Sequence, residues 1–437
     1  MNFSFSICDR KSPFSYVVWG ILLHSLGKVF LNITQMQLIY AATCCFGWYY
    51  IFRGFYLARH HLSFQLPRKH LRLLFLYLIL CIIMIVRGYL IDYPYQWFTT
   101  QGLINFHLFN PTYILPYLMP LFLLWPISDY DFRPIVKASV VISIIVIVCF
   151  FLFYDKILAS SVKQALGTLQ STEDSAETYR YYGQIYINVS LVALCRKYVS
   201  SKVWLINIIA LLFTLLINMM AARRGNSATT GALLLFNIYF YIKSLNRYYK
   251  VLTTIITVVM VSGAVYLASD FSGFGYLKKR GMQDSRSKVD EALMSQMNDV
   301  QLWVGKGLNG RYHFDLHQSY DRFNGWRYVS ETGYYNLVLK GGYLLAWTYI
   351  LLLLYPALLG IFKSRNTLCK ALGFIILLSL VELYPFGHLT FNLKFLVIWM
   401  GVAMLMSPEV RNMDDNEIRD YYFPQAVESN NQIHDRK

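Results

Sequence analysis

Two adjacent arginines, Arg223 and Arg224, stand at the end of an apolar run in the segment Ala-Ala-Arg-Arg-Gly-Asn-Ser. The planar guanidinium fork binds phosphate oxygens bidentately, so a pair of arginines can clamp a phosphate or a pyrophosphate. The alternative is that both side chains snorkel from a helix end toward water, which is common for long cationic side chains. Arg87 lies near the end of another apolar run and is a functional candidate too, because an arginine within a membrane segment is functional by default.

The polar stretch of residues 270–333 carries a second group of cationic side chains and one amphipathic segment. Val289, Leu293 and Met297 repeat every four residues and predict a short amphipathic helix. Each cationic residue alone would be solvated surface or a contact with anionic lipid, but together they favour an anionic substrate. The group comprises Lys278, Lys279, Arg280, Arg286, Arg311, Arg322 and Arg327.

The same stretch holds a carboxylate, two histidines and a glycine-rich segment. Glu331 lies where the stretch meets the next apolar run, and desolvation there raises its proton affinity, which suits a general base. His313 and His317 stand four residues apart, but no third ligand completes a metal site, so the sequence predicts neither a metal nor another cofactor. The segment from Gly305 to Gly310 matches GxGxxG formally but lacks a strand–turn–helix setting. We interpret it as a turn that bends sharply or approaches other backbone closely.

Transmembrane helices are the elements that must position these residues. Of the 437 residues, 56% are hydrophobic and 15% are charged, and the mean hydropathy is +0.40. So much apolar surface fits a bilayer and excludes a soluble protein that binds DNA or RNA. A helix needs about 20 apolar residues to cross the hydrocarbon. The candidate spans are Phe14–Phe30, Met36–Phe52, Leu73–Ile91, Tyr113–Ile127, Ile135–Tyr154, Ile185–Cys195, Val203–Ala221, Ala228–Ile242, Val251–Ser269, Tyr334–Phe362, Ala371–Phe386 and Leu389–Met406.

Clusters of lysine and arginine between the spans set the predicted orientation. Four clusters fall on one side, which the positive-inside rule makes cytoplasmic, together with both termini. Residues 408–437 are then a poorly ordered cytoplasmic tail. The other face carries a smaller loop, 155–183, and a large one, 270–333, between the ninth and tenth helices. The predicted fold is an all-α polytopic integral membrane protein with about twelve transmembrane helices in a single transmembrane domain over 1–437.

Two segments resemble a known family. The run Leu302–Leu308 (LWVGKGL) and the later run Glu331–Gly342 (ETGYYNLVLKGG) are similar to a region of Wzy-type O-antigen and capsular polysaccharide polymerases. In that family the region leads from the long periplasmic loop into the next helix. The chain length, the helix count, the high aromatic content and the cytoplasmic termini also resemble the family. The motifs cover a small part of the chain, and the architecture covers the rest.

The resemblance implies a glycosyltransferase that joins undecaprenyl-pyrophosphate-linked oligosaccharide repeat units at the periplasmic face of the bacterial inner membrane. The lipid-linked oligosaccharide and the bilayer are then its partners, and a chain-length regulator is a candidate partner. Glu331 would be the base, and Arg223 and Arg224 would clamp the pyrophosphate, so that no metal is required. The candidate substrate contacts are Arg280, Arg311, Arg322, Arg327, His313, His317 and Arg87.

Two alternatives stay open. An O-antigen ligase, which attaches the finished polysaccharide to lipid A core, resembles this layout but carries a histidine a few residues before the comparable helix. Here that neighbourhood reads Val329-Ser330-Glu331-Thr332, and His317 is too far upstream, which favours a polymerase. A flippase or transporter of lipid-linked oligosaccharide usually has matching halves and polar groups at the midplane, and this sequence shows no such symmetry.

Overall fold

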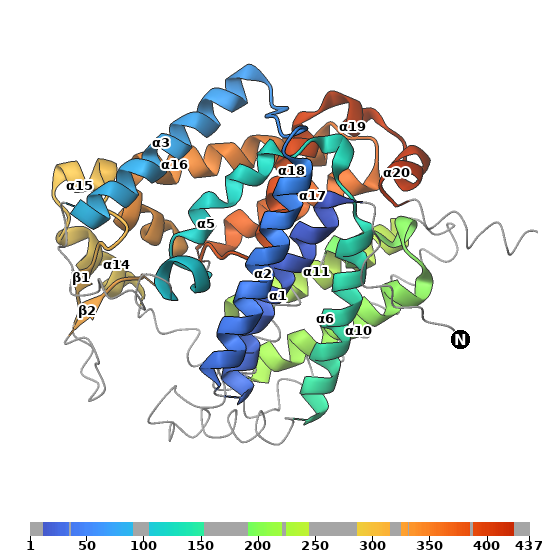
Figure 1. Cartoon of the computed structure of the whole chain (residues 1–437), viewed down its shortest axis with the longest axis horizontal. Coiled ribbons are helices and arrows are strands. Elements are labelled where there is room, and N and C mark those ends of the chain that lie inside the picture. The colour runs from blue at the N-terminus through green and yellow to red at the C-terminus, as the bar shows by residue number, and fades with distance from the viewer. Residues whose placement is uncertain are drawn as a thin grey trace, which may run out of the picture.

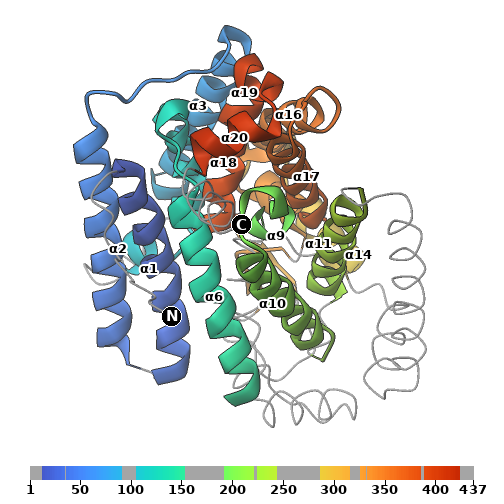
Figure 2. The same ribbon diagram turned by 90° about the vertical axis from the view of Figure 1, so that its right-hand side faces the viewer.

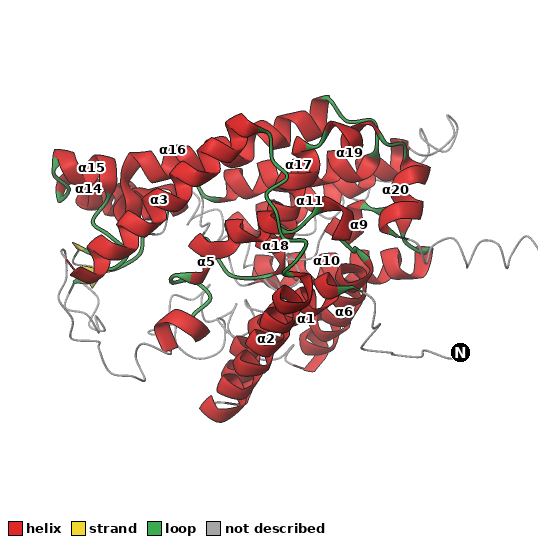
Figure 3. Ribbon diagram, turned by 45° about the horizontal axis from the view of Figure 1, so that its top comes forward, coloured by secondary structure: helices red, strands yellow, loops and turns green. Residues whose placement is uncertain are grey.

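The computed structural model of the protein describes nine stretches of the chain (Figure 1). They are residues 12–34, 36–90, 105–152, 191–220, 224–243, 286–314, 325–330, 332–384 and 388–423. These stretches are mostly helical, with one small two-stranded sheet (Figure 3). Among the described residues, four helices are long and apolar enough to cross a membrane, as a helical membrane protein requires. They are α3 (Arg68–Leu90), α6 (Arg133–Leu152), α10 (Ser201–Met220) and α16 (Gly333–Phe362).

The first two helices, α1 (Pro13–Thr34) and α2 (Gln37–Ala58), form a close pair beside α6 (Figure 2). Their backbones approach so closely that a Cβ atom on Gly20 would lie 2.6 Å from the carbonyl oxygen of Gly47. Small residues permit this approach, which is typical of helices that pack within a membrane. The predicted spans over Phe14–Phe30 and Met36–Phe52 are therefore helices in the structure.

Large apolar side chains cover the outer faces of several long helices. Such a surface would be a liability in water, but it suits contact with lipid tails. Exposed examples on α2, α3, α6 and α16 are Phe46, Phe52, Phe75, Ile79, Ile82, Val148, Phe151, Trp347, Leu351 and Phe362.

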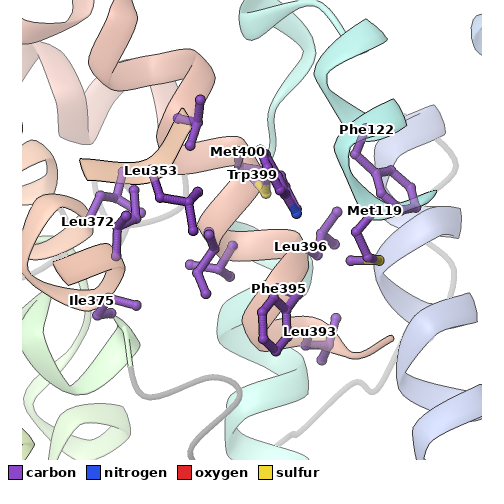
Figure 4. Packing of buried hydrophobic residues seen from close by; sticks show 14 of the residues in the cluster. Met119, Phe122, Leu353, Leu372, Ile375, Leu393, Phe395, Leu396, Trp399 and Met400 are labelled. Atoms are coloured by element: carbon purple, nitrogen blue, oxygen red, sulfur yellow. The ribbon is translucent and has the colours of Figure 1, made fainter. Parts of the chain in front are cut away.

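The core lies where α16 meets α17 (Thr367–Glu382), α18 (Leu393–Met406) and η2 (Met119–Leu124). Figure 4 shows Leu353, Leu372, Trp399 and Met119 from these four elements packed together. Trp399 is 1% exposed, and its ring also lies beside Tyr77 of α3. Within a bilayer this packing stabilises the bundle through van der Waals contacts, because lipid tails are as apolar as these side chains.

The predicted span Tyr113–Ile127 is shorter in the structure. α5 (Leu115–Leu118) and η2 (Met119–Leu124) together form one apolar helix, Leu115–Leu124, and η3 (Ile127–Asp129) follows after a break. Trp125 and Pro126 have extended backbone. The residue before a proline is disfavoured in the helical region, so Pro126 accounts for the end of the helix.

The prediction of a poorly ordered tail is wrong for residues 408–423. These residues form α19 (Pro408–Asn412) and α20 (Asp415–Tyr422), capped by the side chains of Ser407 and Asp414. A capping aspartate satisfies backbone N–H groups that a helix start leaves without partners, and this signal lies in the polar sequence itself. Residues 424–437 lie outside the described stretches.

One carboxylate fastens this C-terminal segment to two other parts of the chain. Asp415 accepts hydrogen bonds from Lys197 Nζ at 2.6 Å, from the Tyr198 hydroxyl at 2.6 Å and from the Thr367 backbone N–H at 2.7 Å. Lys197 and Tyr198 belong to η4 (Arg196–Tyr198), and Thr367 begins α17. We call Asp415 and these three partners the Asp415 junction.

The remaining predicted spans divide into those that the structure describes and those that it does not. Helices α3, α6, α10, α11 (Arg224–Lys243), α16, α17 and α18 cover predicted spans to within a few residues at most ends. Of Ile185–Cys195, the structure describes the short helix α9 (Leu191–Leu194). The span Val251–Ser269 and the loop 155–183 lie outside the described residues, so the total of twelve spans stays a prediction.

Candidate functional site

The segment before α16 folds against the helix bundle. The predicted amphipathic helix is confirmed as α14 (Arg286–Ser295), with Val289, Leu293 and the following Met297 buried. The next helix, α15 (Asp299–Val304), begins with a capping box between Asn298 and Gln301. A small antiparallel hairpin of β1 (Tyr312–His313) and β2 (Trp326–Arg327) follows. Figure 1 shows α14, α15 and the hairpin together at one end of α3 and α16.

The segment Gly305–Gly310, here the glycine turn, closes the gap between α15 and the two long helices. The backbone N–H groups of Lys306 and Gly307 donate to the carbonyl oxygens of Leu339 at 2.8 Å and Lys340 at 3.0 Å on α16. On α3, the Met84 carbonyl accepts from the Leu308 N–H at 3.0 Å. The turn therefore approaches other backbone closely, as the sequence analysis predicted.

A break in α16 makes room for this turn. Gly342 has φ +70°, a conformation that L side chains rarely adopt, and it divides α16 into two helical pieces. A Cβ atom on Gly342 would collide with the backbone of Trp303. In an unbroken helix the carbonyls of Leu339 and Lys340 would accept from residues four positions later, but here the glycine turn supplies the donors.

Four cationic side chains surround the glycine turn. Lys340 is 9% exposed, and its Nζ donates to the Gly310 carbonyl at 2.9 Å. Lys306 is 7% exposed, and its Nζ donates to the Arg311 carbonyl at 3.3 Å. The guanidinium of Arg311 lies 4.4 Å from the ring centre of Trp326, and the guanidinium of Arg327 lies over the ring of Phe314. Stacking covers only the flat face of a guanidinium, and its N–H groups, which bind oxygen atoms, lie in the plane.

Arg87 on α3 lies directly beside the same turn. A Cβ atom on Gly307 would come within 3.0 Å of the Arg87 carbonyl carbon and within 2.5 Å of the Gly88 nitrogen. Asn309 donates to the Gly88 carbonyl at 2.8 Å and accepts from the Tyr113 hydroxyl. The end of α3 is therefore held on the turn by both backbone and side-chain contacts.

A second polar group lies at the start of α16, one helical turn from Lys340. Both carboxylate oxygens of Asp290 accept hydroxyl hydrogen bonds at 3.0 Å, one from Ser330 and one from Thr332. The side chain of Asn336 pairs with the Ser330 backbone and also donates to His388 Nδ1 at 2.9 Å. We call these five residues the α16 entrance, and the α16 entrance together with the glycine turn the loop seam.

Glu331, the predicted base, falls between Ser330 and Thr332 but is itself outside the described residues. Hydroxyl groups on both of its neighbours bind Asp290, and the Ser330 backbone binds Asn336. The α16 entrance therefore fixes the described residues on both sides of position 331, at the start of α16.

The structure brings several predicted site residues together and leaves others undescribed. Arg87, Arg311, His313 and Arg327 all lie at the loop seam, and His313 stacks edge-on against Trp326. The backbone of Arg224 begins α11, which packs against α10 and α17, and its side chain is outside the description. The undescribed predicted residues are Arg223, Arg280, His317, Arg322 and Glu331.

Sequence reasoning missed Lys306 of the glycine turn, Lys340 of α16 and the residues of the α16 entrance. The run Lys340-Gly341-Gly342 inside an apolar stretch was an available signal, because a charge followed by two glycines is unfavourable in a continuous membrane helix. His388 had no such signal. It is 52 positions from Asn336 in the chain, so only the packing of α16 against α17 brings the two together.

No protein-family model matches this chain, and comparison with curated proteins and with solved structures found no match. The class that fold and site define is therefore a helical membrane protein with a cationic and polar site where a folded loop meets two long helices.

Proposed function

We propose that the chain is an O-antigen polymerase, a membrane glycosyltransferase that joins undecaprenyl-pyrophosphate-linked oligosaccharide repeat units. The loop seam would face the periplasm, and both termini would face the cytoplasm of a bacterium with an inner membrane. The observation that carries the proposal is the arrangement of groups along α16. Cationic side chains surround Lys340. The hydroxyl, amide, imidazole and carboxylate groups of the α16 entrance surround Asn336 about 6 Å nearer the helix start, because a helix rises 1.5 Å per residue.

This order matches the chemical order of a lipid-linked oligosaccharide. Its pyrophosphate lies at the membrane surface and its sugars extend into water. Lys306, Lys340, Arg311 and Arg87 would then lie at the depth of the phosphates, where cationic groups favour the charge that develops on a leaving pyrophosphate. The α16 entrance would lie at the depth of the first sugars.

In the proposed reaction, a hydroxyl oxygen of the incoming lipid-linked repeat unit attacks C1 of the first sugar of the growing chain. The bond between C1 and the pyrophosphate oxygen breaks, and undecaprenyl pyrophosphate leaves with the electron pair. The hydroxyl proton passes to a base, and Glu331 is the proposed base because the α16 entrance fixes the peptide on both of its sides.

The gel pattern of surface polysaccharide in the native host tests this proposal. Deletion of a polymerase gene removes the ladder of chain lengths but keeps lipid A that carries a single repeat unit. Deletion of a ligase or of a flippase removes all attached polysaccharide, and that pattern would replace the proposal by one of these alternatives. A strain that carries Glu331→Gln should show the single-repeat pattern, whereas a normal ladder would exclude Glu331 as the base.

The orientation has its own test. Reporters that are active only outside the cytoplasm, fused after Asp284 and after Asn226, should both be active. A reporter that is active only in the cytoplasm should be silent at both positions. A cytoplasmic result after Asp284 would place the loop seam on the wrong side for this reaction.

A further inference from the structure

The break at Gly342 divides α16 into two pieces of unequal length. The whole helix has 30 residues, so it would be about 45 Å long if it were straight, which exceeds the hydrocarbon core of a bilayer. The piece from Tyr343 to Phe362 alone is about 30 Å long, which equals the thickness of that core. The exposed Lys363 follows this piece directly, and Lys340 precedes the break. The length of the piece therefore predicts that one boundary of the hydrocarbon core lies at the break.

One face of the longer piece is exposed and apolar. Its exposed side chains recur every three or four positions, which is the spacing of a single helix face. In a helix that crosses a membrane, lipid tails cover such a face. We call this face the α16 stripe, and its side chains are Leu344, Trp347, Leu351, Tyr355, Leu358 and Phe362.

Helix α15 extends the α16 stripe past the break. Val300 and Trp303 are 64% and 58% exposed, and they are neighbours on the surface of α15 because they are three positions apart. The Trp303 ring lies edge-on to the ring of Tyr343, with 6.0 Å between the ring centres, and Tyr343 precedes Trp347 by one helical turn. A Cβ atom on Gly342 would lie 2.2 Å from the Trp303 carbonyl carbon, so the break itself lets α15 pack at this level. Figure 1 shows α15 beside this end of α16.

We propose that Val300 and Trp303 insert into the head-group layer of the bilayer, and that α15 is an anchor that fixes the depth of the glycine turn. Tryptophan favours this layer because its ring is apolar and its N–H can donate to water or to head groups. The exposed face of α15 continues the α16 stripe at the level where the hydrocarbon core ends, which fits a lipid surface better than a protein partner.

The anchor has a consequence for the cationic side chains of the glycine turn. The turn begins at Gly305, directly after α15, so Lys306 would lie at the level of the lipid phosphates. The inference goes beyond the proposed function, because it holds for either orientation of the chain and for any reaction at the loop seam.

Depth-dependent fluorescence quenching in phosphatidylcholine nanodiscs tests the position of α15. A fluorescent amino acid, incorporated by codon suppression, would replace Val300 in the full chain. The two control positions are Leu351, on the α16 stripe, and Glu291, an exposed residue of α14. The three quenchers are a lipid with a nitroxide on its head group, a lipid with a nitroxide in the middle of its acyl chain, and iodide in the water.

Each quencher should act most strongly at a different position. We expect the head-group nitroxide to quench the label at Val300 most, the acyl-chain nitroxide to quench the label at Leu351 most, and iodide to quench the label at Glu291 most. Iodide quenching at Val300 as strong as at Glu291, without quenching by either lipid, would place α15 in water and overturn the proposal. Stronger quenching of the label at Val300 by the acyl-chain nitroxide would also overturn it, because the break would then lie inside the hydrocarbon core.

Two variants of Trp303 test whether this side chain is the anchor. Trp303→Asp removes the ring and adds a charge, so the label at Val300 should lose quenching by the head-group nitroxide and gain quenching by iodide. Trp303→Tyr keeps an interfacial aromatic ring and should leave both signals unchanged. The label at Leu351 should respond equally in all three proteins if the bundle is intact. Unchanged quenching at Val300 in Trp303→Asp would exclude Trp303 as the anchor.

Discussion

The two ends of α16 hold polar groups in different ways. At the end near Phe362, the Asp415 junction joins a carboxylate to a lysine, a phenol and a backbone N–H at 2.6–2.7 Å. At the other end, the two buried lysines of the loop seam donate to neutral carbonyl oxygens, and two arginines stack on aromatic rings. The first arrangement joins opposite charges, and in the second the cationic groups contact neutral carbonyl oxygens and aromatic rings.

This difference indicates different purposes. Opposite charges that meet in good geometry stabilise a junction between segments, and the Asp415 junction fastens α20 to η4 and α17. The cationic side chains at the glycine turn are those that the proposed function assigns to the pyrophosphate, so we expect their loss to affect activity more than stability. Variants at the two ends of α16 should therefore separate stability from activity.

The largest expected effect is at the break in α16. Gly342→Val puts a branched side chain at φ +70° and against the Trp303 backbone, so strain and overpacking add to about 4 kcal/mol or more. Thermal unfolding in detergent should show a large fall in the midpoint, and polymerisation should be lost. The matched control is Gly231→Ala in α11, where an added Cβ has no atom within 4 Å and should be tolerated. An unchanged thermal unfolding midpoint for Gly342→Val would contradict the break in α16 at this residue.

Arg311→Ala should lower polymerisation on the order of 10²-fold, because a charge that faces the developing anion is lost. Its stability should fall by only about 1–2 kcal/mol, because the cation–π contact with Trp326 is partly buried. Arg196→Ala is the control, since that guanidinium also stacks, at 4.1 Å from the Tyr241 ring centre, but near the Asp415 junction. Equal losses of activity in Arg311→Ala and Arg196→Ala would contradict a functional difference between the two ends of α16.

Asp415→Asn should lower stability and leave activity unchanged, which is the reverse of the effect expected for Arg311→Ala. It removes the charge that binds Lys197 and weakens the bonds from Tyr198 and Thr367, which we expect to cost about 2 kcal/mol after allowance for partial exposure. Polymerisation per folded molecule should be unchanged. Asp420→Asn is the control, because Asp420 pairs with Arg419 on an exposed surface and contributes little. A stable Asp415→Asn protein with low activity would contradict the structural role.

The smallest effect is the acid dependence of this junction. Burial alone would raise the pKa of Asp415, but hydrogen bonds from Lys197, Tyr198 and Thr367 outweigh burial and hold that pKa below its usual value. The stabilisation is therefore complete above the unfolded pKa of about 3.9 and is lost as the pH falls through the lower folded pKa. The gap in unfolding midpoint between wild type and Asp415→Asn should stay constant from pH 7 to about 4.5 and narrow below about 4. If the gap narrowed near neutral pH, the pH-dependent stabilisation would come from another titratable group.

The sequence predicted those features of the fold that follow from local pattern. Long apolar runs gave α3, α6 and α16, and the spacing of Val289 and Leu293 gave α14. The errors came where local chemistry competed with apolar content. Pro126 ended the helix within Tyr113–Ile127, and capping residues ordered the polar segment after Met406.

The candidate site was predictable only in part, for a physical reason. Arg87, Arg311 and Arg327 stood out because the predicted topology places them on the outer face, where the positive-inside rule makes cationic residues scarce. Their meeting at one glycine turn depends on backbone contacts between segments more than 200 positions apart, such as Leu308 with Met84. The bond between Asn336 and His388 depends on tertiary packing in the same way, and no spacing rule contains it.

Photocrosslinking in the native host tests most directly whether the loop seam binds the substrate. A photoreactive phenylalanine analogue would replace Val329, which is 51% exposed beside the α16 entrance, or Tyr421, which is 53% exposed at the far end of α16. We predict an adduct from position 329 that carries acid-labile, diphosphate-linked sugar, and no such adduct from position 421. An adduct of this kind at position 421 alone, or equally at both positions, would contradict a substrate site at the loop seam.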